Sequence, residues 1–193
     1  MHIFCPKSIR LIPPPLKFRP IISQCSAFAT PLSKYTASIL TPLVGTFSKA
    51  HLINSQDFTT RLTNFYTNNP HMLSAPLVSL DVESLFTKVP LPIVLSFLHK
   101  KFSENNLQLP SGLTIDALIA LIDLCCESTV FSFNGRFYQQ TAGVAMGSPL
   151  ACILANIFME FFKEELMILY LAQPTFRCRF VDGIFLHLAT WDG

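Results

Sequence analysis

The chain carries the run LVSLDV at residues 77–82, a short apolar segment that ends by presenting the carboxylate of Asp81. Its length and apolarity predict a β-strand. A second acid, Asp182, is followed by glycine and lies between the apolar runs 176–181 and 184–188. An Asp-Gly pair between two such runs is typical of a two-residue β-hairpin. We therefore expect two carboxylates, distant in sequence, to meet at one end of one sheet.

Apolar residues recur at helical spacing in four segments around these strands. Thr114 has the side chain of an N-cap for one helix, and Ser148-Pro149 opens the longest. Asn134-Gly135 separates two further apolar runs and predicts a hairpin with positive φ at both turn residues. The order of these elements predicts an α+β fold, with helices covering one face of the sheet. The expected helices cover about residues 32–43, 92–101, 115–125 and 149–170.

Composition limits the class of protein. Of the 193 residues, 50% are hydrophobic and 13% are charged, which is too apolar for a disordered chain and raises the hypothesis of a membrane-associated protein. The longest charge-free run, 137–159, is long enough to span a bilayer, but its glycines, proline and amides disfavour a span. The N-terminus has no apolar run of signal-peptide length before Pro6-Lys7, so secretion is not expected.

Cysteine spacing and charge distribution further limit the class of protein and the partners it suits. The six cysteines form neither a paired framework nor a C-x-x-C motif, so we expect reduced, mostly buried thiols rather than a disulfide scaffold or a zinc site. Residues 1–56 contain six basic residues and no acid, whereas the remainder contains eight basic and twelve acidic residues. This asymmetry suits a polyanionic partner beside metal-binding carboxylates, although a lopsided solvated surface explains it equally well.

Two carboxylates at one end of a sheet suit phosphoryl transfer. Two divalent ions a few ångströms apart clamp the attacking and leaving oxygens in such reactions, and hard ions such as Mg²⁺ prefer carboxylate oxygens. Single acids at strand ends and Asp-Gly turns are common, however. Spacing alone therefore leaves a purely structural reading of Asp81 and Asp182 open.

Four segments, taken in order, favour the catalytic reading. They are SLDVESLFTKVP (79–90), FSFNGRFYQQ (131–140), GVAMGSPL (143–150) and RFVD (179–182). These segments closely resemble the Penelope-like reverse transcriptases. Three upstream segments resemble the fingers of that family, namely RPIIS (19–23), LSKY (32–35) and SQDF (55–58). The resemblance therefore covers nearly the whole chain.

The resemblance implies a right-hand polymerase palm, which is a ferredoxin-like sheet with covering helices, together with partial fingers. It assigns residues 1–76 to partial fingers and 77–193 to the palm, as one truncated reverse transcriptase domain. The thumb of the family, and the GIY-YIG endonuclease that many members carry, are not expected in this chain. The implied activity is RNA-directed DNA polymerisation with Mg²⁺, deoxynucleoside triphosphates, an RNA template and a DNA primer, in the nucleus or cytoplasm.

The resemblance also implies roles for single residues. Asp81 and Asp182 match the catalytic, metal-binding carboxylates, and the backbone carbonyl of Val82 adds an oxygen to one metal. Phe86 matches a gate against a ribose 2′-hydroxyl, with a core phenylalanine as the alternative. Arg19 matches the finger arginine that clamps the incoming triphosphate, with an exposed surface arginine as the alternative.

Further nucleotide contacts are implied elsewhere in the matching segments. Lys7 resembles the remnant of the first basic finger motif of the family. Gly143 and Gly147 are expected to let the backbone approach a base pair. The helix that follows Ser148 is expected to point its positive end toward the substrate.

Gly183 departs from the family, which has a second consecutive acid after the one that Asp182 matches. We expect the hairpin to survive, because glycine accepts positive φ freely. The missing carboxylate leaves the charge of two metal ions less neutralised, and we expect a rate loss of about 10² or more. An impaired reverse transcriptase is the primary hypothesis. The alternatives are a non-catalytic nucleic-acid-binding remnant and a gene-model error at Gly183, and Phe86 argues against a viral RNA-dependent RNA polymerase with the same palm.

Overall fold

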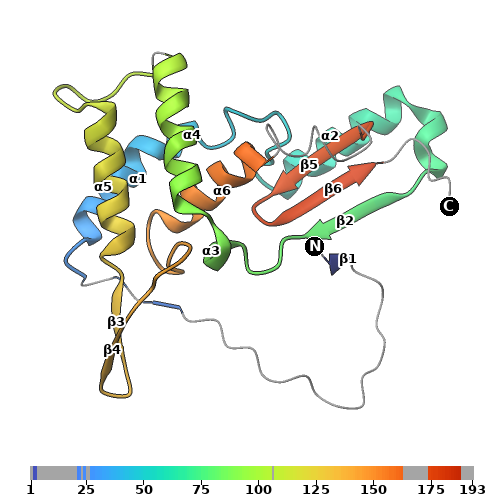
Figure 1. Ribbon diagram of the computed structural model, residues 1–193. Coiled ribbons are helices and arrows are strands. Elements are labelled where there is room, and N and C mark those ends of the chain that lie inside the picture. The colour runs from blue at the N-terminus through green and yellow to red at the C-terminus, as the bar shows by residue number, and fades with distance from the viewer. Residues whose placement is uncertain are drawn as a thin grey trace.

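A computed structural model describes residues 2–3, 21–22, 24, 27–105, 107–162 and 174–187 (Figure 1). In chain order the elements are β1 (His2–Ile3), α1 (Thr30–Leu40), the 3-10 helix η1 (Thr41–Leu43), α2 (Ser55–Asn68), the 3-10 helix η2 (Pro70–Ser74), β2 (Leu77–Asp81), α3 (Leu85–Lys88), α4 (Leu91–Glu104), α5 (Ile115–Glu127), β3 (Val130–Phe133), β4 (Arg136–Gln139), α6 (Ala151–Phe161), β5 (Phe176–Phe180) and β6 (Gly183–His187). The fold mixes helix and sheet, as the sequence predicts.

Strands β1, β2, β6 and β5 form one antiparallel sheet in that order. Leu77 of β2 pairs with His187 of β6, and Asp81 of β2 pairs with Gly183 of β6. Phe180, the last residue of β5, pairs with the same Gly183. The strand and the hairpin that the sequence predicts are therefore hydrogen-bonded neighbours, and Asp81 ends β2 beside the hairpin.

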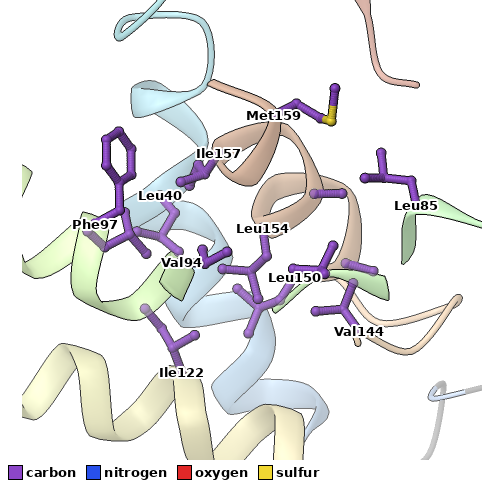
Figure 2. Close-up of a cluster of buried hydrophobic side chains, with 14 of the residues drawn as sticks. Leu40, Leu85, Val94, Phe97, Ile122, Val144, Leu150, Leu154, Ile157 and Met159 are labelled. Atoms are coloured by element: carbon purple, nitrogen blue, oxygen red, sulfur yellow. The ribbon is translucent and has the colours of Figure 1, made fainter. Parts of the chain in front are cut away.

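One face of this sheet contributes to a shared hydrophobic core. Leu80 of β2 and Ile184 of β6 belong to a buried cluster with residues of five helices, α1, α3, α4, α5 and α6. Figure 2 shows Leu40 of α1, Val94 of α4 and Leu154 of α6 packed together in this cluster. Burying one such side chain fully stabilises the fold by about 1.5–3 kcal/mol. Segments on both sides of residue 76 thus share one core.

Helix α2 covers the opposite face of the sheet. Phe58 packs against Phe185 in a tilted arrangement with ring centroids 4.7 Å apart, and the ring centroids of Phe65 and Phe176 are 5.0 Å apart. Phe185 alternates along β6 with the core residue Ile184, so the two side chains point to opposite faces. The expectation that helices cover one face only is wrong. The second face also carries aromatic side chains, and these require cover from water.

The edge of β5 is covered by the segment that precedes α2. The N–H of Arg179 donates to the carbonyl of Ala50 at 2.7 Å, and the carbonyl of Arg179 accepts from the N–H of Leu52 at 2.8 Å. His51 forms a parallel bridge with Arg179 between these two bonds. An edge strand covered in this way does not offer its backbone groups to other chains.

Two sequence-based predictions of local structure are confirmed. The Thr114 hydroxyl accepts from the N–H of Ala117 at 3.2 Å and caps α5. Asn134 and Gly135 have φ of 49° and 72° between β3 and β4, so they form the expected two-residue turn with positive φ at both positions.

Two other local predictions are wrong in detail. The second hairpin turns at Val181-Asp182 rather than Asp182-Gly183, because Gly183 pairs with both Phe180 and Asp81 as the first residue of β6. Gly183 is not among the glycines with positive φ, whereas Val181 has φ of 51°. Helix α6 begins at Ala151 instead of Pro149. The expected continuation of that helix toward residue 170 lies outside the described residues beyond Phe162.

The charge-free run 137–159 does not form one helix. It is divided among β4, a loop and the first part of α6. Within the described ranges, no helix combines the length and the apolarity that a membrane crossing requires.

Candidate functional site

The two acids that the sequence singles out lie on adjacent parts of the sheet. Asp81 is the last residue of β2, and Asp182 is the second residue of the β5–β6 turn. The N–H of Val82 donates to the carbonyl of Asp182 at 3.2 Å, so the backbone of the turn is bonded directly to the end of β2. Asp81 is exposed and Asp182 is half-buried. The fold therefore brings the two positions together, while their roles as metal ligands stay predictions.

The turn that carries Asp182 is strained. Val181 has φ of 51°, which lies in the left-handed region that β-branched residues avoid. A conformation of this kind costs about 1–2 kcal/mol and persists only when its surroundings hold it in place. Both turn carbonyls are held: that of Val181 accepts from Nη1 of Arg179 at 2.8 Å, and that of Asp182 accepts from Val82.

Arg179 reaches the turn from a buried polar cluster on the core face of β5. Arg179 is 5% exposed. Nη1 also donates to Oδ1 of Asn156 at 2.8 Å, and Nη2 lies 3.3 Å from Nδ1 of His51. Nη2 is 3.8 Å from Oε1 of Glu160, whose side chain is fully buried. Burial lowers the pKa of Arg179 below its usual value, whereas the nearby charge of Glu160 raises it. The guanidinium stays charged at neutral pH.

Glu160 anchors this cluster to the loop after η1. Its Oε1 accepts from the N–H of Gly45 at 2.7 Å, and its Oε2 accepts from the N–H of Phe47 at 3.0 Å. A buried carboxylate needs such partners, because an unpaired buried charge is strongly destabilising. The sequence did not identify Glu160, Asn156 or His51 as part of the site. Only their proximity to Arg179 reveals them, since Asn156 and Glu160 lie on α6 while His51 lies in the segment before α2.

Gly143 holds the GVAMGSPL segment against α3. The N–H of Val144 donates to the carbonyl of Phe86 at 2.7 Å. Gly143 has φ of +70°, and a Cβ at this position would lie 2.4 Å from the Phe86 oxygen and 2.6 Å from Cα of Thr87. Here the missing side chain allows the backbones of two protein segments to approach. The predicted approach to a base pair is a separate matter and stays a prediction.

Phe86 itself is half-buried and packs against the hydrophobic core. This position is compatible with both readings, a core phenylalanine and a gate at the nucleotide. The structure shows that its backbone, through the bond to Val144, ties the two sequence motifs together.

Gly147 makes a second close backbone contact. It has φ of +107°, and a Cβ there would lie 2.2 Å from the carbonyl oxygen of Ile22. The N–H of Ile22 donates to the carbonyl of Met146 at 2.8 Å. The hydroxyl of Ser148 accepts from the N–H of Leu150 at 3.3 Å, just before α6 begins. This segment therefore joins the palm-like motifs to the chain that follows Arg19.

The other two predicted nucleotide contacts, Lys7 and Arg19, lie outside the described residues. Their proposed contacts with phosphate stay predictions from the sequence.

The donor atoms at the end of β2 are of the chemical type that binds a hard divalent cation. Asp81 and Asp182 supply carboxylate oxygens and Val82 supplies a carbonyl, the ligand types that Mg²⁺ prefers. In number they are few: the part of the chain that the structure describes contains no group of three or more His, Cys, Asp or Glu side chains placed to hold a metal. Gly183, which is the partner of Asp81 across the sheet, contributes no carboxylate.

A comparison with protein families gives a match over nearly the whole chain. Residues 7–191 match the family described as "Reverse transcriptase (RNA-dependent DNA polymerase)". Curated protein sequences give no significant match.

Solved structures with a similar fold include two telomerases. The apo telomerase of Candida tropicalis, truncated from its C-terminal domain, has a TM-score of 0.62 at 14% identity, over 88% of this chain and 36% of that one. The telomerase of Candida albicans in complex with a TWJ fragment of telomeric RNA has a TM-score of 0.62 at 16% identity, over 83% of this chain and 30% of that one. At these identities the likeness shows the fold alone, and the chain spans about a third of either structure.

Proposed function

Since the chain belongs to the reverse transcriptase (RNA-dependent DNA polymerase) family, we propose that it forms part of the polymerase domain of a Penelope-like element. In this proposal residues 1–76 are partial fingers and 77–193 are the palm. The reaction is transfer of a deoxynucleotide from its triphosphate to a DNA primer that is paired with an RNA template. The Penelope-like assignment is supported by the four ordered segments described above.

The observation that carries the proposal is the meeting of Asp81 and Asp182 at one end of the sheet. Asp81 is paired with the residue next to Asp182, and Val82 is hydrogen-bonded to Asp182. In the proposed reaction these two carboxylates and the Val82 carbonyl hold the divalent ions. Bound Mg²⁺ supplies electrostatic stabilisation of the charge on the phosphate oxygens.

The remaining predicted residues complete the proposed substrate site. Phe86 limits the space beside the ribose, and Gly143, Gly147 and Ser148 place the loop before α6. Lys7 and Arg19 contact phosphates, a task that suits the planar guanidinium of arginine. The Candida albicans telomerase structure contains a telomeric RNA fragment, and this supports RNA as a partner class here.

A second candidate function is favoured by Gly183. The acid that the resemblance implies at this position is missing, so the chain has fewer carboxylates with which to balance two divalent ions. In this alternative the chain binds a primer–template duplex without extending the primer.

Primer extension with Mg²⁺ separates these functions. We expect the chain to bind an RNA–DNA primer–template, measured by fluorescence anisotropy, and to extend it slowly. Asp81→Asn is expected to abolish extension and leave binding of the duplex within about threefold, because binding depends mainly on phosphate contacts elsewhere. Binding without any extension supports the non-catalytic alternative. Absence of binding contradicts both.

A further inference from the structure

We propose that Arg179 is a positioning residue that holds the Val181-Asp182 turn in its strained conformation and thereby fixes Asp182 beside Asp81. The role of Asp182 as a metal ligand rests on the function proposed above. The mechanical part of the inference, that Arg179 holds the turn, rests on the contacts alone.

The first step is the strain. Val181 lies at φ of 51°, and the cost of this conformation for a β-branched residue favours a different turn unless a contact opposes the change. The bond from Nη1 of Arg179 to the Val181 carbonyl, at 2.8 Å, is such a contact. It fixes the peptide plane between Val181 and Asp182, since that carbonyl belongs to the peptide unit that Asp182 continues.

The second step is the rigidity of Arg179 itself. Its backbone is bonded on both sides to the covering segment, through Ala50 and Leu52. Its side chain is fixed on α6 by Asn156, with bonds to Oδ1 at 2.8 Å and to the carbonyl at 3.4 Å. Because both the backbone and the side chain of Arg179 are fixed, its guanidinium holds the turn at a fixed position relative to helix α6.

The third step is the cost of a buried charge. Placing a guanidinium in the interior is expensive, and an apolar side chain of similar volume commonly fills such a space at equal or greater stability. An apolar side chain would nevertheless leave the Val181 carbonyl without its donor. Lysine would keep the charge near Glu160 but lacks the planar fork with which Nη1 serves Asn156 and Val181 together.

Hydrogen exchange in the metal-free chain tests the inference directly. The reporter is the Val82 amide, which donates to the Asp182 carbonyl and so senses the turn. We expect Arg179→Met and Arg179→Lys to raise its exchange rate about tenfold, the effect of losing one net hydrogen bond. The matched control is Arg136→Met, because Arg136 is exposed and lies on β4 in the separate two-stranded β3–β4 sheet. It is expected to leave the Val82 rate unchanged.

A rescue experiment distinguishes positioning from general packing. Val181→Gly removes the strain, because glycine adopts positive φ without penalty. In the Arg179→Lys background it is expected to recover at least about threefold of the lost protection at Val82. A residue that merely fills the core gives no such recovery. The proposal is overturned if the Val82 exchange rate rises in both Arg179 variants only as much as their loss of global stability accounts for. It is also overturned if Val181→Gly restores no protection at Val82.

Metal affinity provides the link to function. With Mn²⁺ as the probe, followed by electron paramagnetic resonance, Arg179→Lys is expected to weaken binding about tenfold, the usual scale for losing a group that orients a metal ligand. Unchanged Mn²⁺ affinity in a variant whose turn has loosened overturns the link to Asp182. If Asp182→Asn leaves Mn²⁺ affinity unaltered, the proposed metal site fails instead, and the Val82 exchange rate still decides the role of Arg179.

Discussion

Gly183 is the direct partner of Asp81 across the two strands, so the position that lacks an acid lies opposite the first acid of the proposed metal site. Directly paired residues in antiparallel strands place their side chains on the same face. Asp182 lies one residue earlier, in the turn, with its carbonyl bonded to the N–H of Val82. The missing carboxylate would therefore complete a cluster whose backbone is already assembled.

The close contact at Gly143 gives a first prediction about stability. We expect Gly143→Ala to destabilise the fold by at least about 2 kcal/mol, because the new Cβ combines left-handed strain with a clash against the Phe86 carbonyl. Urea unfolding measures the loss. The matched control is Gly112→Ala, since Gly112 has φ of +82° but a Cβ added there would meet no atom within 4 Å. It is expected to cost only about 1 kcal/mol of strain. Equal losses at the two sites would contradict the tight contact.

The neighbourhood of His51 predicts a pH dependence of stability. Burial lowers the pKa of His51 below its usual 6.5, and the charges of Arg179 and Arg61 lower it further, while Asp57 opposes them. The folded chain thus keeps His51 neutral where the unfolded chain takes up a proton. This contribution to stability is full above about pH 6.5 and is lost as the pH falls from there through the lowered pKa.

His51→Asn tests this assignment, because the asparagine oxygen can accept the Arg179 bond without titrating. We expect the free energy of unfolding of the variant to change less between pH 7 and pH 5 than that of the unaltered chain. The titration of Asp57 does not contribute to the change between pH 7 and pH 5. Its pKa is lowered from 3.8 by the hydrogen bond from Arg61, so its contribution is lost only in stronger acid. Parallel pH profiles for the two proteins would show that another group is responsible.

Cysteine reactivity gives a third prediction. Burial, followed by the charges of Cys125 and Asp123, raises the pKa of Cys126 to about 12. Burial also raises the pKa of Cys178. Cys152 is exposed. Because the thiolate is the reactive form, iodoacetamide at pH 8 is expected to alkylate Cys152 at least about 100-fold faster than Cys126. Peptide mapping by mass spectrometry measures the rates, and denatured protein, in which the thiols become equivalent, is the control.

The sequence predicts the secondary structure well wherever short-range chemistry determines it. Thr114 caps a helix, and Asn134-Gly135 turns a hairpin, because each depends on a bond or a φ value within a few residues. The pairing of β2 with the second hairpin agrees with the expectation drawn from the apolar run that carries Asp81 and the two runs that flank Asp182. These elements are sufficient to place the two acids together.

Long-range register and buried polar contacts are not available from one sequence. The Asp-Gly pair suggests a turn at 182–183, but pairing across the sheet makes Gly183 a strand residue and leaves Val181 strained. The cluster of Arg179, Asn156 and Glu160 joins segments whose separation along the chain hides their contact. Gly143 was expected to serve a base pair, yet its immediate neighbour is the backbone of α3.

The final prediction is that aspartate at position 183 strengthens metal binding. Gly183 is a strand residue without positive φ, and a Cβ there would lie 3.5 Å from the Phe180 carbonyl and 3.9 Å from the Phe185 ring, which are ordinary contacts. Gly183→Asp therefore adds no backbone strain. Repulsion by Asp81 opposes the gain from replacing a strand glycine, and each effect is about 0.5–1 kcal/mol, so we expect stability without metal to change by less than about 1 kcal/mol.

Bound divalent metal removes the repulsion between Asp81 and an aspartate at position 183, because both carboxylates then coordinate the same positive charge. We expect Gly183→Asp to bind Mn²⁺ at least about tenfold more tightly than the unaltered chain and to raise Mg²⁺-dependent primer extension by a similar factor. Gly183→Asn is the matched control, since it has the same size without the charge. Adding Asp81→Asn to Gly183→Asp should abolish the gain. If the aspartate variant binds Mn²⁺ no better than the asparagine variant, a carboxylate at 183 is not what the site lacks, and the metal ligands lie elsewhere.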